Sequence, residues 1–228
     1  MQYHRIGIAK RLILAKKFKQ AKALLMPFAL KGNVRAQMLL GYLYFGGDTN
    51  TSARQAESWL RKSARKGNAD AMAMLAEMDF KHGFRSSEAQ TPLMIKAALN
   101  GSAEAQRSLA CSYVNSHLVD KNITQAMYWD EKAAQQGLAE SQHDLALMLL
   151  HGMTGEVDVS KAIYWYQQSA AKDCNVPYAE WAAEALARIY RGIPDQKFRD
   201  DELAQYWRGR AQYLSTLAFR PHPDWFYK

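Results

Sequence analysis

The sequence lacks most of the features that point to catalysis or metal binding. It has two cysteines, Cys111 and Cys174, which have no metal-like spacing, so we read both as unlinked thiols. The six histidines are scattered, and no two stand three or four residues apart as a helical metal pair requires. No phosphate loop, nucleophile elbow or dinucleotide fingerprint occurs. The sequence therefore argues against an enzyme and predicts no catalytic residue, cofactor or metal site.

Long apolar runs are also missing. No run approaches the roughly 18–20 residues of a transmembrane helix. The basic first residues show no uninterrupted apolar core and no cleavage site of a signal peptide, because Lys10, Arg11 and Lys16 interrupt them. As written, the chain is expected in the cytoplasm. If a signal peptide had been removed, a periplasmic or secreted location and a disulfide between Cys111 and Cys174 would be the alternatives.

Acidic residues are scarce in the first third. Residues 1–66 carry a net charge of +12, whereas residues 67–228 carry −4, within a total of +8. The basic stretch is either the solvated face of a helix, which we favour, or a docking surface for an acidic protein. An anionic membrane surface is a less favoured ligand, and nucleic acid is disfavoured because only Tyr3 and Phe18 could stack on bases there. The candidates for electrostatic docking are Lys16, Lys17, Lys19 and Lys22.

An internal repeat dominates the rest of the sequence. The segment AMYWDEKAAQQG at 126–137 returns 36 residues later as AIYWYQQSAAKD at 162–173. Spacings of 34 to 36 residues, the period of a two-helix repeat, separate the last positions of successive copies, which are Gly32, Gly67, Gly101, Gly137 and Asp173. A tryptophan stands eight positions before the end of three copies, and an altered last copy repeats the signature. These tryptophans are Trp59, Trp129, Trp165 and Trp207.

The repeat spells a pair of helices joined by a tight corner. Each glycine suits the left-handed residue that ends one helix, and Asn33, Asn68 or Ser102 suits the N-cap of the next. A small residue then precedes leucine by four positions, as Ala36 precedes Leu40, and another small residue follows the leucine. Small residues at this spacing let helices approach closely. The pattern predicts an all-α, right-handed α/α superhelix of about six antiparallel helix pairs.

The same positions resemble the Sel-one-like repeat family, a relative of the tetratricopeptide repeats. Its first helix follows A-x-x-x-L-G/A-x-x-Y-x-x-G, which Ala36, Leu40, Gly41, Tyr44 and Gly47 match. Its second helix follows A-x-x-W-x-x-x-A-A-x-x-G, which Ala126, Trp129, Ala133, Ala134 and Gly137 match. The resemblance extends over about residues 18–212 and implies a scaffold or adaptor that binds proteins rather than an enzyme.

We expect a single helical-repeat domain over residues 1–218, followed by an aromatic C-terminal strap. The expected units are a shortened first pair at 3–32, repeats at 33–67, 68–101, 102–137 and 138–173, an altered last pair at 179–218 and the strap at 219–228.

Residues on a binding surface should differ between copies of the repeat, whereas residues at the packing positions should stay the same. Positions two and six residues after the small residue of each first helix lie on one face, turned away from the leucines. The candidates on this concave face are Met38, Tyr42, Glu77, Arg107 and His143. The favoured function is a non-enzymatic protein-interaction scaffold. A toxin-neutralising or enzyme-inhibiting partner is one alternative, and an envelope or cell-surface assembly factor, which requires export, is another.

Overall fold

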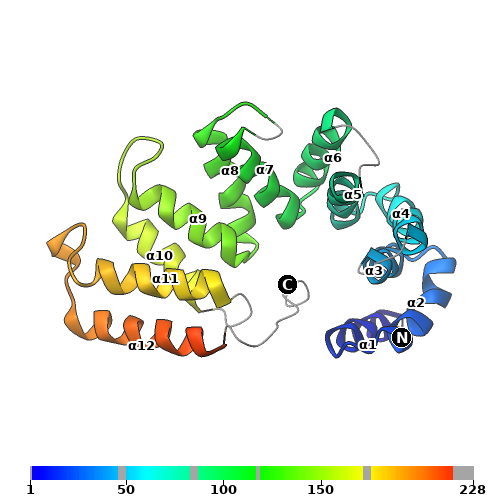
Figure 1. The fold of residues 1–228 in the computed structure, drawn as a ribbon, viewed down its shortest axis with the longest axis horizontal. Helices are drawn as coiled ribbons and strands as arrows, with labels where there is room; N and C mark the ends of the chain where they lie inside the picture. Colours follow the sequence, from blue (N-terminus) through cyan, green and yellow to red (C-terminus); the bar gives the residue numbers. More distant parts are fainter. Residues whose placement is uncertain (1, 46–49, 83–86, 117–118, 172–175, 218–228) are drawn as a thin grey trace. The chain divides into compact units, whose positions relative to one another are not determined.

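The computed structural model describes residues 2–45, 50–82, 87–116, 119–171 and 176–217. All regular structure in these ranges is helical, as predicted (Figure 1). The helices of unit 1 are α1 Gln2–Leu14, α2 Phe18–Leu30, α3 Val34–Phe45, α4 Asn50–Ala64, α5 Ala69–His82 and α6 Ser87–Leu99. The others are α7 Ala103–Asn115, α8 Ile123–Gln135, α9 Ala139–Leu150, α10 Val159–Ala170, α11 Val176–Ile189, the short 3-10 helix η1 Gln196–Phe198 and α12 Asp201–Leu217.

The chain forms two compact units, Met1–Leu109 and Ala110–Lys228, and the division falls within α7. In unit 1, each helix from α1 to α5 packs against the next helix along the chain. In unit 2, the same holds from α8 to α11. Alternate helices also touch, since α3 contacts α1 and α5, and α9 contacts α11. Each unit is therefore a stack of helix pairs, and the predicted all-α class is confirmed.

The corners between pairs have the predicted chemistry. The four glycines at residues 32, 67, 101 and 137 have φ between 84° and 89°, the left-handed region that glycine adopts without a steric penalty. At the first corner, the Gly32 N–H donates to the Ala29 carbonyl and the Asn33 N–H to the Phe28 carbonyl, as in a Schellman motif. The Asn33 side chain then accepts the Ala36 N–H at 2.9 Å. Only three residues, 31–33, separate the end of α2 from the start of α3.

The first pair is joined differently. Helices α1 and α2 each span 13 residues. The link between them turns through Lys16, whose φ is +56°, with the Lys17 N–H donating to the Leu12 carbonyl. A lysine here adopts the conformation that glycine adopts at the other corners.

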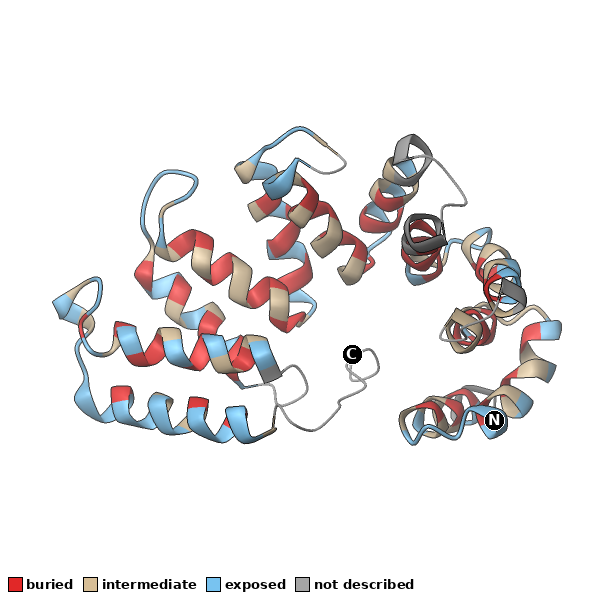
Figure 2. Ribbon diagram, viewed as in Figure 1, coloured by how far each residue is buried: buried red, intermediate tan, exposed pale blue. Residues whose placement is uncertain are grey.

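The cores lie between successive helices (Figure 2). In unit 1, Leu60 of α4 is fully buried against Gly41 of α3, where an added Cβ would lie 2.5 Å from the leucine Cγ. In unit 2, the core surrounds Tyr166 and Leu186, and both side chains are at most 1% exposed. The signature tryptophans Trp165 and Trp207 pack at the edge of this core. The residues that recur in each copy of the repeat are therefore residues that pack between helices.

Buried glutamines tie neighbouring pairs together. The Gln37, Gln106 and Gln142 side chains each donate from Nε2, over 3.0 Å, to a carbonyl near the end of the preceding helix. The acceptors are Ala29, Ala98 and Ala134 respectively. All three glutamines are at most 5% exposed. Each corner is therefore held by a side-chain hydrogen bond in addition to its backbone hydrogen bonds.

None of the described helices combines the length and the apolar character that a membrane span needs.

Candidate functional site

An aromatic cluster joins α9 to α11 in unit 2. The His143 ring lies 5.7 Å from the Tyr178 ring and 6.0 Å from the Trp181 ring, measured between centroids. Tyr178 and Trp181 meet edge to face at 5.2 Å. Trp181 is 49% exposed, whereas Tyr166, which also packs on His143, is 1% exposed. We call His143, Tyr178 and Trp181 the Trp181 surface.

The position of Trp181 in the repeat explains its exposure. It stands one residue before Ala182, the small residue that packs in the first helix of the last pair. The first helices of the four preceding repeats have a charged residue there, namely Arg35, Asp70, Glu104 and Glu140. This position faces solvent at least in part in every described pair, so a tryptophan there is not required by the packing of the repeat.

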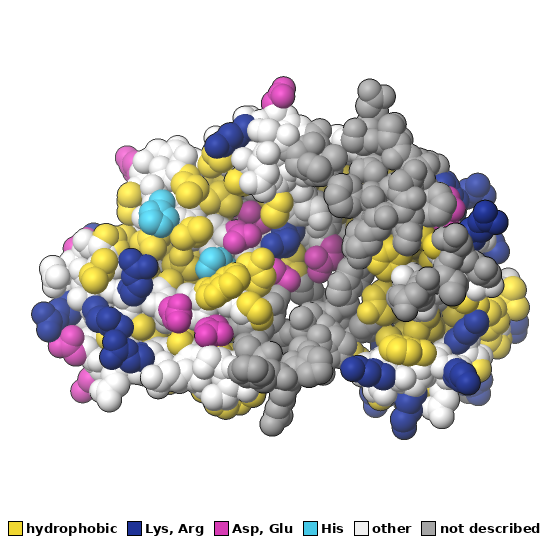
Figure 3. All heavy atoms as spheres, viewed as in Figure 1, with side chains coloured by type: hydrophobic (Ala, Val, Ile, Leu, Met, Phe, Trp, Pro, Cys, Tyr) yellow, Lys and Arg dark blue, Asp and Glu magenta, His cyan; other side chains and the backbone are white. Residues whose placement is uncertain are grey.

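Carboxylates accompany the aromatic rings. The Asp144 Oδ1 lies 3.2 Å from the His143 Nδ1. Burial, together with the nearby Asp144 charge, raises the pKa of Tyr166 to about 12, so this phenol stays neutral. Glu180 and Glu184 on α11 instead line the space between α11 and α12, where burial and the neighbouring Glu184 raise the pKa of Glu180 above its usual value. On the face drawn in Figure 3, hydrophobic side chains of unit 2 gather around a histidine, with acidic side chains beside them. An aromatic surface bordered by carboxylates suits a basic or amphipathic side chain.

The family follows from comparison with known proteins. The Sel1 repeat matches residues 34–68, 103–138 and 139–174. The chain contains three Sel1 repeats. The predicted repeat at 68–101 lies between the matched segments, and its helices α5 and α6 still pack as a pair. No curated protein matches the sequence.

Several solved structures share the Sel1 repeat fold. A Sel1 repeat protein from Oxalobacter formigenes is 23% identical with a TM-score of 0.74, and the match covers 93% of this chain and 88% of that one. A protective antigen of uropathogenic Escherichia coli is 24% identical with a TM-score of 0.67, over 89% of this chain and 45% of the antigen. An immunity protein from Pseudomonas aeruginosa is 18% identical with a TM-score of 0.62, over 97% and 89% of the two chains. These similarities show the fold, and Sel1 repeats generally serve as non-catalytic protein-binding scaffolds.

The predicted concave-face residues of this chain have different surroundings. Met38 and Tyr42 are half-buried and pack against the core of unit 1, and burial raises the pKa of the Tyr42 phenol. Arg107 is half-buried on α7. The Glu77 side chain lies outside the described residues. His143 packs on Tyr178 and on the exposed Trp181, which was not among the predicted residues.

The predicted docking lysines are not equivalent. Lys16, Lys17 and Lys19 are exposed around the link between α1 and α2. The Lys22 ammonium instead lies 4.2 Å from the centre of the Tyr44 ring, so its charge stacks on the neighbouring α3. Three of the four lysines are therefore exposed to solvent.

Cys111 is half-buried on α7. Cys174 and the strap at 219–228 lie outside the described residues. In the described part of the chain, no three His, Cys, Asp or Glu residues are grouped to hold a metal ion.

Proposed function

We propose that this chain acts by binding, without catalysis, and receives a protein partner on the Trp181 surface. The observation that carries the proposal is an indole left half-exposed at a position where the other four repeats have charged residues. Exposed tryptophan is the residue type most enriched among the energetic centres of protein interfaces.

The surface is fixed before the partner arrives. Tyr178 and His143 hold the Trp181 ring from two sides, and His143 rests on the buried Tyr166. Little side-chain freedom is then lost on binding, which favours affinity. The carboxylate of Asp144 and the exposed indole face together suit an arginine or lysine of the partner.

The test compares Trp181→Ala with Tyr164→Ala. Tyr164 is a matched control because it is 53% exposed and lies on α10, away from the cluster around His143. Proteins retained by the intact chain from native lysate are identified, and the affinity of the purified partner is measured by calorimetry. We expect Trp181→Ala to weaken binding by about 2 kcal/mol, roughly 30-fold, and Tyr164→Ala to leave it unchanged. Equal binding by both variants and the parent would exclude the Trp181 surface.

An acidic partner at the basic link is a separate proposal. The Lys16→Glu/Lys17→Glu/Lys19→Glu variant reverses three exposed charges and leaves the Lys22–Tyr44 contact in place. A partner docked by charge should be lost both in this variant and at high salt. A partner retained under both conditions would show that the lysines only solvate the helices.

Toxin neutralisation is the second candidate, because two of the similar solved structures are immunity proteins from Pseudomonas aeruginosa. In this case the purified partner would be an enzyme whose activity falls to zero at one equivalent of this chain. The same titration with Trp181→Ala would retain activity. A partner whose activity does not change would count against neutralisation.

The location of the chain completes the proposal. We place it in the cytoplasm, and cell fractionation tests this placement. Recovery in the periplasm or at the cell surface would instead favour the envelope assembly role.

A further inference from the structure

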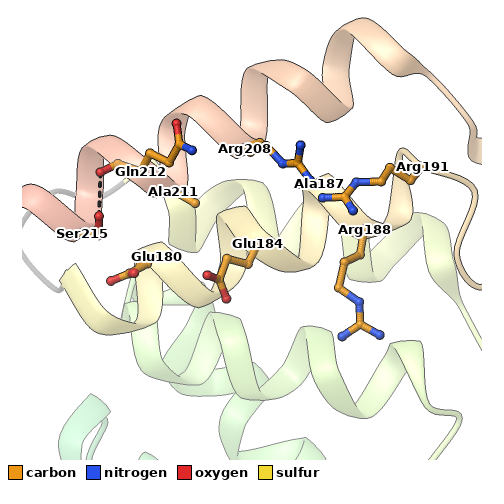
Figure 4. A pocket seen from close by; sticks show the side chains of 9 residues that line it. All are labelled: Glu180, Glu184, Ala187, Arg188, Arg191, Arg208, Ala211, Gln212 and Ser215. Atoms are coloured by element: carbon orange, nitrogen blue, oxygen red, sulfur yellow. Dashed lines mark hydrogen bonds between the residues drawn. The ribbon is translucent and has the colours of Figure 1, made fainter.

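A groove of about 430 Å³ runs between α11 and α12. Its floor holds Ala187 and Ala211, and polar side chains rise around it (Figure 4). The lining residues from α11 and the turn after it are Glu180, Glu184, Ala187, Arg188 and Arg191, and those from α12 are Arg208, Ala211, Gln212 and Ser215. We call this the α11–α12 groove.

Alignment of the last helix pair with the preceding pair shows which residues occupy the corresponding positions of α9 and α10. Leu186 corresponds to Leu145, so Glu180, Glu184, Ala187 and Arg191 correspond to Ala139, His143, Ala146 and Leu150 of α9. Trp207 corresponds to Trp165, so Arg208 corresponds to Tyr166 of α10. Of these α9 and α10 residues, Ala146 and Tyr166 belong to the core cluster that holds Ala179, Ala182 and Ala183 of α11, and Leu150 packs against it. His143 contacts Tyr178 and Trp181 of α11.

The helix that packs on this pair, α11, has a defined direction. Figure 1 shows α9 and α11 running in the same direction, and Ala139, Ala146 and Tyr166 are at most 1% exposed in the second pair of unit 2. In the last pair, the corresponding groove is open and its borders are charged.

The charges of the groove are separated along its length. Glu180 and Glu184 stand toward the start of α11, and Figure 4 shows Arg191 and Arg208 pointing toward one another at the other end. Among the described residues, neither guanidinium makes an ion pair, although Arg61 and Arg199 on exposed surfaces do. Two like charges that face each other without a counterion favour a negatively charged ligand.

We propose that the α11–α12 groove binds an α-helix of a partner protein, parallel to α11, with basic residues in its first half and acidic residues in its second half. In this orientation the positive N-terminal end of the helix dipole lies near Glu180 and Glu184, and the negative end lies near Arg191 and Arg208. The alanine floor admits a helix with small residues on its contact face, as α9 and α10 admit Ala179, Ala182 and Ala183. This groove is a second binding surface, independent of the Trp181 surface.

The probe is a synthetic fluorescent helix of about 14 residues, the length of α11. It has alanine on its contact face, lysine in the first half and glutamate in the second, and a staple on the opposite face so that helicity does not depend on charge order. The control peptide has the same composition with the two charged halves exchanged. Binding to the full chain is measured by fluorescence anisotropy at low salt.

We expect the probe to bind at least about 10-fold more tightly than the exchanged peptide. The Arg191→Glu/Arg208→Glu variant should reverse this preference, and the Lys121→Glu/Lys132→Glu variant, with the same change in net charge elsewhere on unit 2, should keep it. Equal binding of the two peptides, no binding of either, or the same loss in both variants would overturn the proposal.

Two further measurements exclude other occupants. If the parent chain self-associates in the ultracentrifuge and the double arginine variant is monomeric, the groove takes a second copy and the proposal is wrong. If the probe binds only after residues 218–228 are removed, that segment of the same chain occupies the groove, which also overturns it. The probe reports on the groove alone, so its failure leaves the test of the Trp181 surface unaffected.

Discussion

Changing Gln142 to glutamate tests whether the side-chain hydrogen bond across a corner holds the pairs together. Gln142 is 3% exposed, and its Nε2 donates to the Ala134 carbonyl over 3.0 Å, while its Oε1 is buried without a hydrogen-bond partner. Glutamate has nearly the same shape. At neutral pH, however, it removes the donor and places a carboxylate against a carbonyl oxygen in a dry site.

The size of the effect has an upper limit. An uncompensated buried charge costs about 3–5 kcal/mol. The folded protein can protonate the carboxyl instead, which at pH 7 costs about 1.36 kcal/mol for each of the roughly 2.7 units above the usual pKa of about 4.3. We therefore expect Gln142→Glu to lose about 3–4 kcal/mol of unfolding free energy at pH 7. Because the folded pKa is raised, this loss should disappear as pH falls toward about 4.

Urea unfolding followed by circular dichroism at pH 7 and pH 4 measures both values. Gln135→Glu, on the exposed surface of α8, is the control for adding one negative charge. Gln142→Met should stay within about 1 kcal/mol of the parent, because it loses one neutral hydrogen bond and a buried unpaired oxygen together. In the repeat at 68–101, the residue that corresponds to Gln142 is already a methionine, Met72. A Gln142→Glu protein as stable at pH 7 as Gln135→Glu would refute the reasoning, since the carboxylate would then reach water.

Three further predictions concern packing, backbone and pH. Gly41→Ala should destabilise by about 1–2 kcal/mol, because its Cβ would lie 2.5 Å from Leu60 atoms, and the loss should shrink when Leu60→Ala is added. Gly67→Ala should destabilise the protein by about 1 kcal/mol, because Gly67 has a φ of +85°. Gly209→Ala should stabilise it by a similar amount, because Gly209 lies inside α12 and no atom is near the added Cβ. Thermal unfolding of both variants measures the two effects. The pKa of Tyr166 is raised to about 12 in the folded protein, so its neutral phenol contributes fully to the unfolding free energy below about pH 10. As pH rises to about 12, the unfolding free energy should fall by about 2–3 kcal/mol. A Tyr166→Phe protein that loses as much stability as the parent over this range would contradict that assignment.

The corners could be predicted from the sequence because their chemistry is local. A glycine that accepts a positive φ and an asparagine that caps the next helix act within six residues, so Gly32 and Asn33 determine the corner without help from the rest of the fold. The helix pairs were predictable for a similar reason, since the spacing of small residues and leucines reports which face of each helix is buried.

The buried glutamines needed the structure. Glutamine follows the small residue of the first helix in three copies, as at Gln37, and this regularity was visible in the sequence. Its meaning was not, because the hydrogen bond depends on how a helix lies against the end of the previous one. The half-buried Met38 and Tyr42 show the same limit. Spacing placed them on one face of α3, but only the packing of the neighbouring helices shows how much of that face is covered.

Trp181 was hidden by the shifted register of the last pair. Residues 174–178 interrupt the period, and only counting back from Leu186 aligns Trp181 with the charged residues of the other first helices. In this alignment, Trp181 is an aromatic residue at a position where the four preceding repeats have a charged residue.

The same counting separates residues that build this fold from residues available to a partner. At packing positions the copies keep small residues, such as Gly41 and Ala146, because a small residue lets the neighbouring helix approach closely. Packing between helices does not explain Trp181 or the facing Arg191 and Arg208. An exposed indole leaves apolar area in water, and facing guanidinium groups repel one another, so each arrangement is less favourable in the free protein than the residues the repeat has elsewhere. A bound partner would cover the indole and neutralise the arginines, which is why both binding proposals rest on the positions where the last pair departs from its own repeat.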